Sequence, residues 1–254
     1  MAIELPTQKI EPKSQNPSRL ILFSTPKHGK TTAVAALDNC LLIDLESGSD
    51  FVSALKVKVN SLEELQELGT EIMKAERPYK YIAIDTVTKL EEMLEWDATE
   101  EYMKQPVGKA FNRDPKDLSK FLPRNQWKSV LTLPNGGGYM WLRLSMTTWI
   151  NKISKLAPHI ILIGHLKEKM IDFQGKEISQ KALDLTGKIA SITCANADAI
   201  AYLYRGDDGI HLNFAANDTT VCGARPEHLK GKDIQLSETI DGQIVYHWDR
   251  IFMD

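Results

Sequence analysis

The sequence predicts an α/β fold with a mostly parallel twisted sheet, helices on both faces and added C-terminal strands. Short apolar runs without alternation, typical of strands buried on both faces, occur at 20–23, 40–44, 81–85 and 159–164. Segments with helical character separate them, at 31–37, 61–72, 87–103 and 139–156. Further strand-like segments follow at 199–204, 210–214 and 244–248. We expect one domain over 19–254, preceded by an extended, proline-containing N-terminal arm at 1–18 that could contact another subunit.

Local signals justify the individual elements. The first apolar run leads into a loop containing Pro26 and Gly29, and an alanine-rich helix follows that loop. Ser61 and Glu64 form a capping box, which predicts a helix start at this point. The run at 81–85 (YIAID) is followed directly by a segment with helical character.

Two long connections interrupt this pattern. Residues 104–138 contain four prolines and end in Gly136–Gly138, and a connection of this length is typical of a functional loop. Residues 165–184 form the second loop, with a hairpin expected around 173–175 and a helical segment expected at 185–195.

The composition excludes several classes of protein. With 31 basic and 34 acidic residues the net charge is −3, so any contact with nucleic acid must come from a local patch. No apolar run approaches the length of a membrane span, and the first 13 residues contain no apolar stretch typical of a signal peptide. The 3 cysteines are widely spaced, which argues against a disulfide framework and a zinc site. We therefore expect a cytoplasmic protein without a membrane partner.

The loop after the first strand matches the phosphate-binding pattern G-x-x-x-x-G-K-[ST], except that serine replaces the first glycine. Backbone N–H groups of such a loop wrap a β-phosphate at the start of a helix. Lys30 would reach the β- and γ-phosphates, and the Thr31 hydroxyl would hold Mg²⁺. The alternative is a chance G-K-T at a helix start, but the strand–loop–helix order favours ATP and Mg²⁺ as ligands. The expected nucleotide-binding residues are Ser24, Thr25, Pro26, Lys27, His28, Gly29, Lys30, Thr31 and Thr32.

Three polar residues stand at the ends of the other buried strands. Asp85 ends its strand where a carboxylate would bind the Mg²⁺ shell, although an aspartate there could simply cap the next helix. Glu46 follows the strand 41–44 and could act as general base on the attacking water, or be a solvated loop residue. His165 could contact the γ-phosphate and report its presence to the following loop. The alternative for His165 is a backbone hydrogen bond at the strand end.

These residues together resemble the core of the RecA-type recombinases. The stretch LLIDLE at 41–46 is similar to the family sequence "FIDAE", which places Glu46 on the catalytic glutamate. The stretch YIAIDTVTKL resembles the family's "VVDSV", and His165 stands where the family usually has a glutamine as its γ-phosphate sensor. The resemblance implies a DNA-stimulated, Mg²⁺-dependent ATPase that assembles into a ring or filament. It also implies that the loops at 104–138 and 165–184 contact single-stranded DNA.

The sequence is most similar to the short RecA-like ATPases of bacteriophages, some of which act in single-strand annealing or recombination. The shared features are the loop at 26–31, the strand end Ile163–His165 and a late G-x-R at Gly223–Arg225. This resemblance implies a location in the host bacterial cytoplasm and a single-strand binding protein as a further partner. Arg225 could act on the ATP of a neighbouring subunit, or pair on the surface with Glu227.

The loop at 104–138 carries seven basic residues against two acidic ones and interleaves them with aromatic side chains. Cations suit phosphates and aromatic faces suit bases, a combination that single-stranded nucleic acid needs. A solvated surface loop with buried aromatics is the alternative. In the second loop, Lys167 and Lys169 lie nearest the sensor. The candidate DNA-binding residues are Lys109, Phe111, Arg113, Lys116, Lys120, Arg124, Trp127, Lys167 and Lys169.

Two functions therefore compete. The first is a RecA-like ATPase that binds single-stranded DNA and promotes annealing or recombination. The second is a nucleotide-dependent interaction protein, which would recruit a replication or assembly partner without binding DNA.

Overall fold

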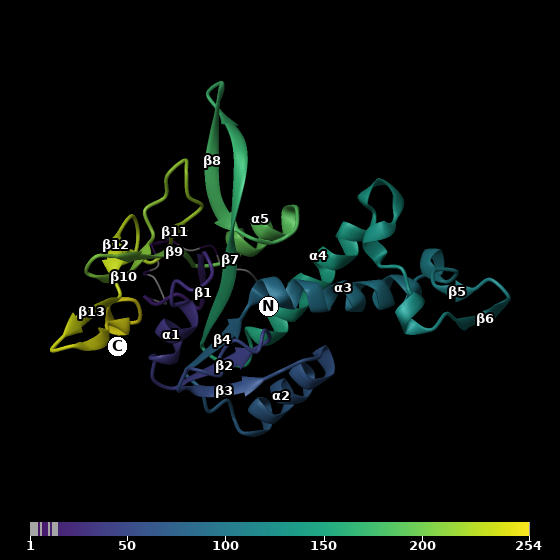
Figure 1. Cartoon of the computed structure of the whole chain (residues 1–254), viewed down its shortest axis with the longest axis horizontal. Helices are drawn as coiled ribbons and strands as arrows, with labels where there is room; N and C mark the ends of the chain where they lie inside the picture. Colours follow the sequence, from purple (N-terminus) through teal and green to yellow (C-terminus); the bar gives the residue numbers. More distant parts are fainter. Residues whose placement is uncertain (1–4, 6, 10, 12–14, 254) are drawn as a thin grey trace.

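The computed structural model describes residues 5, 7–9, 11 and 15–253. Its core is a parallel sheet with the strand order β9-β1-β7-β4-β2-β3. The bounds are β1 Arg19–Ser24, β2 Cys40–Asp44, β3 Leu55–Lys58, β4 Tyr81–Asp85, β7 His159–Phe173 and β9 Ala199–Gly206. The predicted α/β fold with a mostly parallel sheet is confirmed (Figure 1).

The continuous apolar runs of the central strands reflect burial on both faces of the sheet. Leu20, Leu22 and Ile161 face one core cluster, whereas Ile21, Phe23 and Leu162 face the other. All six side chains have an exposed fraction of 0%. Each fully buried aliphatic or aromatic side chain contributes about 1.5–3 kcal/mol to folding, so the central strands are fixed firmly within the sheet.

Helices cover both faces of this sheet. One face carries α2 (Leu62–Lys74), α3 (Val87–Lys104), α4 (Gly138–Ile153) and α5 (Lys188–Ala195), whose apolar side chains join the larger core cluster. The other face carries α1 (Lys30–Ala35) and the C-terminal turn η5 (Trp248–Arg250). The indole Nε1 of Trp248 donates to the carbonyl oxygen of Ala33 at 2.8 Å. The C-terminal segment therefore supports the helix that follows the phosphate loop.

The C-terminal strands extend the sheet beyond β9 in the antiparallel sense. β10 (Gly209–Asn213) pairs with β9, and β12 (Asp233–Gln235) pairs with β10, while β11 (Gly223–Ala224) pairs with the start of β9. The strand expected at 244–248 is shorter than predicted. It is β14 (Gln243–Tyr246), which pairs only with β13 (Ser237–Ile240) in a separate ribbon.

The segment 104–138 is more ordered than the predicted loop. It folds into short 3₁₀ turns, η1 (Pro106–Gly108), η2 (Arg124–Gln126), η3 (Val130–Thr132) and η4 (Pro134–Gly136), and a small hairpin of β5 (Arg113–Asp114) and β6 (Asp117–Phe121). Figure 1 shows this hairpin at the far end of the α3–α4 pair, away from the sheet.

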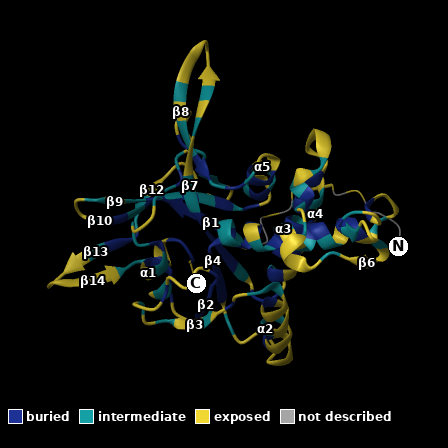
Figure 2. Cartoon of the chain, turned by 45° about the vertical axis from the view of Figure 1, so that its right-hand side comes forward, coloured by how far each residue is buried: buried dark blue, intermediate teal, exposed yellow. Residues whose placement is uncertain are grey.

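The expected second loop is a long β-hairpin. β7 continues beyond the sheet to Phe173, and β8 (Lys176–Leu183) returns antiparallel to it. Gln174 and Gly175 make the turn with positive φ angles of 53° and 78°, close to the predicted position. The hairpin stands away from the body of the protein, and Figure 2 shows that its tip is exposed.

The expected N-terminal arm at 1–18 falls partly on residues 1–4, 6, 10 and 12–14, which lie outside the described residues. Near its end, Asn16 exchanges hydrogen bonds with the backbone of Met253. None of the helices in the described part of the chain has both the length and the apolar character needed to cross a bilayer.

Candidate nucleotide site

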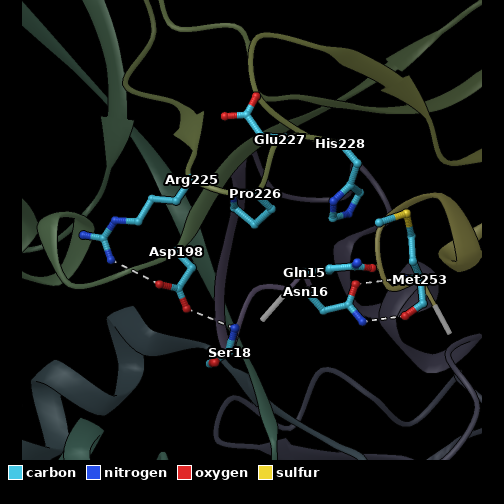
Figure 3. A pocket seen from close by; sticks show the side chains of 9 residues that line it. All are labelled: Gln15, Asn16, Ser18, Asp198, Arg225, Pro226, Glu227, His228 and Met253. Carbon is cyan, nitrogen blue, oxygen red and sulfur yellow. Dashed lines mark hydrogen bonds and ion pairs between the residues drawn. The ribbon is translucent and has the colours of Figure 1, made fainter. Parts of the chain in front are cut away.

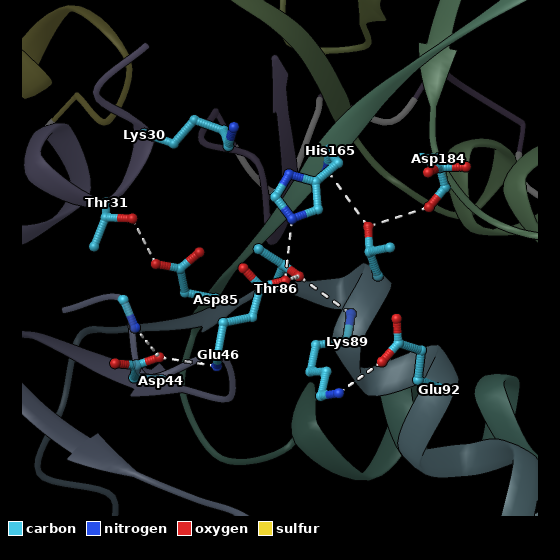
Figure 4. A network of polar contacts seen from close by, with 12 residues as sticks. Lys30, Thr31, Asp44, Glu46, Asp85, Thr86, Lys89, Glu92, His165 and Asp184 are labelled. Atoms are coloured by element: carbon cyan, nitrogen blue, oxygen red, sulfur yellow. Dashed lines mark hydrogen bonds and ion pairs between the residues drawn. The ribbon is translucent and has the colours of Figure 1, made fainter. Parts of the chain in front are cut away.

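The polar residues predicted at the strand ends converge at one edge of the sheet. The register pairs Ser24 of β1 with His165 of β7, and Asp44 of β2 with Asp85 of β4. Because the strands are parallel, their carboxyl ends meet at the edge where ligands bind in open α/β sheets. Figure 4 shows Lys30, Thr31, Asp85, Glu46 and His165 gathered there.

The phosphate loop has the backbone shape that its glycine permits. Gly29 adopts a left-handed conformation with φ 94° and is the N-terminal cap of α1. Thr25 and His28 close the loop through a contact of 2.9 Å between Thr25 Oγ1 and His28 Nε2. Pro26 and Lys27 lie between them, and Thr32 lies in the first turn of α1.

Lys30 is buried inside this loop. Its ammonium donates to the Ser24 carbonyl at 3.1 Å, the Ser24 hydroxyl at 3.1 Å and the Thr25 carbonyl at 3.0 Å. The serine that replaces the usual glycine therefore supplies an acceptor for the lysine. Burial lowers the pKa of Lys30, and the charges of Asp85 and Glu46 oppose that shift. These two carboxylates therefore help to keep Lys30 cationic.

Thr31 and Asp85 form a direct pair. The Thr31 hydroxyl donates to Asp85 Oδ2 at 2.6 Å, joining the start of α1 to the end of β4. Burial raises the pKa of Asp85, and the hydrogen bond from Thr31 partly counteracts this effect. A hydroxyl and a carboxylate are hard oxygen ligands, which suits Mg²⁺.

Glu46 lies at the centre of a second polar group. Its Oε1 accepts from the Thr86 hydroxyl at 2.5 Å and lies 3.1 Å from His165 Nε2. The other ring nitrogen of His165, Nδ1, is buried and has no hydrogen-bond partner among the described residues. Glu46 is thus held beside β4 and β7 rather than free in a solvated loop. The backbone N–H of His165 also donates to Thr88 Oγ1, at 3.4 Å.

Asp44 positions Glu46, a role that was not predicted from the sequence. Its carboxylate accepts from the backbone N–H groups of Glu46 (3.0 Å), Gly48 (3.3 Å) and Ser49 (2.9 Å), and from the Ser49 hydroxyl (2.5 Å). Burial alone would raise the pKa of Asp44, but these hydrogen bonds outweigh it and lower the pKa. The signal available in the sequence was an aspartate at a buried strand end two residues before the glutamate.

Polar contacts also fix the base of the β7–β8 hairpin to α3. Thr88 Oγ1 of α3 donates to the carbonyl oxygen of Asp184 at 3.1 Å, and within the hairpin base Lys167 pairs with the Asp184 carboxylate at 3.1 Å. The buried carboxylate of Glu91 accepts from the backbone N–H of Thr186 at 2.9 Å and 3.1 Å. The hairpin is therefore joined to the same strand–helix connection that carries Asp85 and Thr86.

The candidate DNA-binding residues of 104–138 differ in their accessibility. Phe111 is half-buried: it packs against the larger core cluster, and its ring lies at 80° to that of Tyr102. The guanidinium of Arg113 lies 3.7 Å from the ring centroid of Phe121. The indole of Trp127 donates to the carbonyl oxygen of Leu122 at 2.7 Å.

Several cations of this segment are paired and others are not. Arg124 pairs with Glu100 at 3.0 Å, and Lys120 pairs with Asp117 at 3.1 Å. The exposed ammonium groups of Lys109, Lys116 and Lys128 make no ion pair with any described residue. Lys169 is likewise without an ion pair there, on the projecting part of β7.

Arg225 lies at the opposite edge of the sheet from the phosphate loop. Its guanidinium donates to Asp198 at 3.1 Å and to the carbonyl oxygen of Ala195 at 2.7 Å, so the alternative of a pair with Glu227 is wrong. Asp198 also accepts from the backbone N–H of Ser18 at 3.0 Å. These residues line a cavity of about 610 Å³ beside the N- and C-terminal segments (Figure 3).

The arrangement fits a nucleotide with its metal ion. Lys30 and the loop amides offer positive groups to phosphates, while Thr31 and Asp85 offer oxygen to a cation. No group of three or more His, Cys, Asp or Glu side chains in the described chain could hold a metal by itself. Mg²⁺ bound with a nucleotide usually takes one or two protein oxygens together with phosphate oxygens, and Thr31 and Asp85 would supply the protein oxygens. The fold and this site define a P-loop nucleotide-binding protein.

The match to a family model agrees with that class. Residues 16–225 match the family model described as AAA domain, and the chain therefore belongs to this family of P-loop ATPases. A search of curated proteins gives no match. Among solved structures, the chain is similar to a KaiC-like protein of the archaeon Pyrococcus horikoshii OT3, at 12% identity and a TM-score of 0.43. That similarity covers 91% of this chain and 89% of the other.

Replacing Asp44 with asparagine tests the anchor of the Glu46 loop. Because the folded-state pKa of Asp44 is lowered, its stabilisation is present above the unfolded-state pKa and disappears as the pH falls through the folded-state value. Asp44→Asn should lower the free energy of unfolding at pH 7 by about 1.5–3 kcal/mol, the range for a charge-assisted hydrogen bond. The difference in stability between pH 7 and pH 3 should shrink in the variant.

Urea unfolding at pH 7 and pH 3 measures the free energy of unfolding of the wild type and of Asp44→Asn. Asp50→Asn is the matched control, because Asp50 forms only an exposed ion pair with Lys58 and should change stability by less than about 1 kcal/mol. The same pH dependence in Asp44→Asn as in the wild type would contradict the proposed anchor.

Proposed function

We propose that this protein is a Mg²⁺-dependent ATPase that binds single-stranded DNA and promotes annealing or homologous recombination, as a bacteriophage-type RecA-like protein would. The observation that carries the proposal is the convergence of Lys30, the Thr31–Asp85 pair and Glu46 at one edge of the sheet. Membership in a P-loop ATPase family supports the nucleotide part of the proposal. The DNA part rests on the basic segment 104–138 and on Lys169 of the β7–β8 hairpin, which has no ion pair among the described residues.

Each polar residue has a distinct role in hydrolysis. Lys30 would leave its carbonyl partners to bind the β- and γ-phosphates, and a bound Mg²⁺, held by Thr31 and Asp85, would neutralise phosphate charge. Glu46 orients the attacking water and accepts its proton as general base. Thr86 and His165 restrict the Glu46 carboxylate to one position through their contacts with Oε1. A carboxylate held in one position is oriented toward the attacking water more often than a mobile carboxylate would be.

His165 connects the site to the β7–β8 hairpin. It is the first residue of β7 beyond the buried core of the sheet, and its ring contacts Glu46. A γ-phosphate near Glu46 would compete for the His165 ring and thereby alter the start of the hairpin. The contacts of Thr88 and Glu91 with residues 184 and 186 give the same hairpin a second connection to the site. Nucleotide would therefore control the hairpin, in the manner of a γ-phosphate switch.

The proposed DNA surface consists of cations without an ion pair to any described residue, in the segment 104–138 and on the β7–β8 hairpin. Lys109, Lys116 and Lys128 carry charge without an ion-paired partner in the described chain, and Lys169 does so on β7. Phe121 has an exposed fraction of 43% and already lies under the Arg113 guanidinium. Exposed aromatic faces beside free cations suit the bases and phosphates of a single strand. Phe111 offers less of its ring to this surface than Phe121, because it is half-buried and packs against the core.

Self-association into a ring or filament is part of the proposal. Arg225 is separated from its own phosphate loop by the length of β1, about 20 Å for six residues at 3.3 Å each. It can therefore reach a nucleotide only across a contact between subunits. Arg225 would first have to exchange its bond with Asp198 for one with a phosphate.

ATP hydrolysis tests the catalytic assignment. Lys30→Ala and Glu46→Gln should each reduce the Mg²⁺-dependent rate at least about 100-fold, the range for loss of a general base or a phosphate ligand. Glu46→Gln should retain ATP binding, since glutamine keeps the shape of the side chain. Glu67→Gln, on the exposed face of α2, is the matched control and should hydrolyse ATP normally. Single-stranded DNA should accelerate the wild type, and indifference to DNA would favour the recruitment of a protein partner.

Salt-dependent binding tests the DNA surface. Replacement of Lys109, Lys116 and Lys128 with alanine should weaken affinity for single-stranded DNA and reduce the slope of log K against log salt by about 2, at roughly 0.7 per lost contact. Replacement of Lys74, Lys155 and Lys230, exposed on other surfaces, provides the control with the same change in net charge. Equal losses in the two triple variants would show only a general effect of charge and would contradict this location.

Replacement of His165 tests the proposed coupling. In the wild type, a non-hydrolysable ATP analogue should change the affinity for single-stranded DNA. In His165→Ala that change should fall to less than about one third of the wild-type value, because the ring no longer joins Glu46 to β7. Affinity without nucleotide should stay the same, since no DNA contact is removed. An undiminished nucleotide effect in the variant would disprove the coupling.

A further inference from the structure

A second group of residues approaches the phosphate loop from the C-terminal part of the chain. β9 runs parallel to β1, and Arg205 stands three residues beyond the Phe23–Tyr202 pair, on the side of the loop. A Cβ atom added to Gly29 would lie 3.1 Å from Ile210 Cδ1 and 3.6 Å from Arg205 Nη2. The β9–β10 turn therefore contacts the phosphate loop directly.

Arg205 has a free guanidinium at this position. The residue is exposed, and its side chain makes no hydrogen bond or ion pair with another described residue. The nearby carboxylate of Asp208 is taken by His211, at 2.8 Å. Arg205 also lies near Tyr246, whose pKa is raised by burial while the charge of Arg205 opposes the shift. An exposed cation thus lies beside the phosphate loop without an acidic partner among the described residues.

The same turn forms one wall of a pocket of about 260 Å³. The β13–β14 ribbon forms the opposite wall of the pocket. The ribbon packs closely against the β9–β10 turn, since a Cβ atom added to Gly209 would lie only 1.8 Å from the Ser237 carbonyl oxygen. The side chains that line the pocket are those of Arg205, Asp207, Asp208, Ile210, Ser237, Thr239 and Ile244, and the Ser237 hydroxyl already accepts from the backbone N–H of Ile210 at 2.9 Å. Arg205 and Ile210 belong both to the pocket and to the contact with Gly29, so the pocket begins where the phosphate loop ends.

The chemistry of this pocket suits a nucleoside. Ile244, with an exposed fraction of 59%, offers apolar contact to a flat ring, and the exposed Thr239 hydroxyl and Asp207 carboxylate offer hydrogen bonds to its edge or to a ribose. An arginine guanidinium stacks on aromatic faces as well as binding oxygen. The volume is slightly below the roughly 300–1,000 Å³ of pockets that enclose drug-sized ligands, which fits a base whose phosphates lie outside.

We propose that Arg205 and the pocket between the β9–β10 turn and the β13–β14 ribbon bind the base and ribose of the nucleotide. This inference rests on the proposed binding of ATP by the phosphate loop. The phosphates occupy the loop around Lys30, the nucleoside extends past Gly29, and Arg205 covers the base. The C-terminal ribbon is then a part of the nucleotide site.

Isothermal titration of the full chain with two probes separates the nucleoside from the phosphates. ATP carries both parts, whereas tripolyphosphate carries only the charge. Arg205→Ala and Ile244→Gln should each weaken ATP binding at least about tenfold and leave tripolyphosphate binding within about twofold. Arg205→Lys should not restore ATP binding, because lysine lacks the planar group. Ile240→Gln is the matched control, another exposed isoleucine of the same ribbon outside the pocket, and should change neither affinity.

The outcomes distinguish this inference from the proposed function. Equal loss of ATP and tripolyphosphate binding in Arg205→Ala would make Arg205 a phosphate ligand and overturn the nucleoside pocket. Unchanged ATP binding in Arg205→Ala and Ile244→Gln would also overturn it, while leaving the phosphate loop intact. A wild type that binds neither probe would overturn nucleotide binding itself.

Discussion

The register of four parallel strands is the constraint on which the site depends. Backbone hydrogen bonds align β1 with β7, β7 with β4, and β4 with β2, so that their polar ends meet at one edge. A shift of one residue in β4 would exchange the faces of Ile84 and Asp85 and separate Asp85 from Thr31. Fully buried aliphatic residues prevent such a shift, because each of them would lose its place in the core. The apolar sheet therefore positions the polar chemistry.

The sequence was sufficient to predict the parts of the fold and site that depend on local patterns. Parallel strands buried on both faces appear as continuous apolar runs, and the residue after such a run lies at a known edge. For this reason Asp85, Glu46 and His165 could be expected near Lys30 from the order of residues alone. The hairpin around 173–175 was also predictable, because glycine is the residue that most readily adopts the positive φ angle that Gly175 has in the turn. The assigned chemical roles of these residues are still predictions.

The remainder depended on contacts between distant parts of the chain. β3 was not predicted, since an exposed edge strand of four residues lacks an apolar run. Phe111 looked like a stacking residue, but its contact with Tyr102 is decided by the packing of α3 against the following turns. Arg205 lies far from Gly29 in sequence, and only the pairing of β9 with β1 brings them together. The role of Asp44 was not predicted, because its carboxylate binds backbone N–H groups of the following loop, and such contacts leave no pattern of side chains in the sequence.

The continuity of β7 has a mechanical consequence. The strand begins as the centre of the sheet and ends as the outer half of a hairpin, without a hinge between the two parts. Its eight residues beyond His165 extend about 25 Å at 3.3 Å per residue. A small tilt where the strand leaves the core is therefore magnified at the tip, as at the end of a lever. The projecting hairpin is about as long as the central sheet is wide. Its length sets the distance from the body of the protein at which it can contact a long polymer or a neighbouring copy.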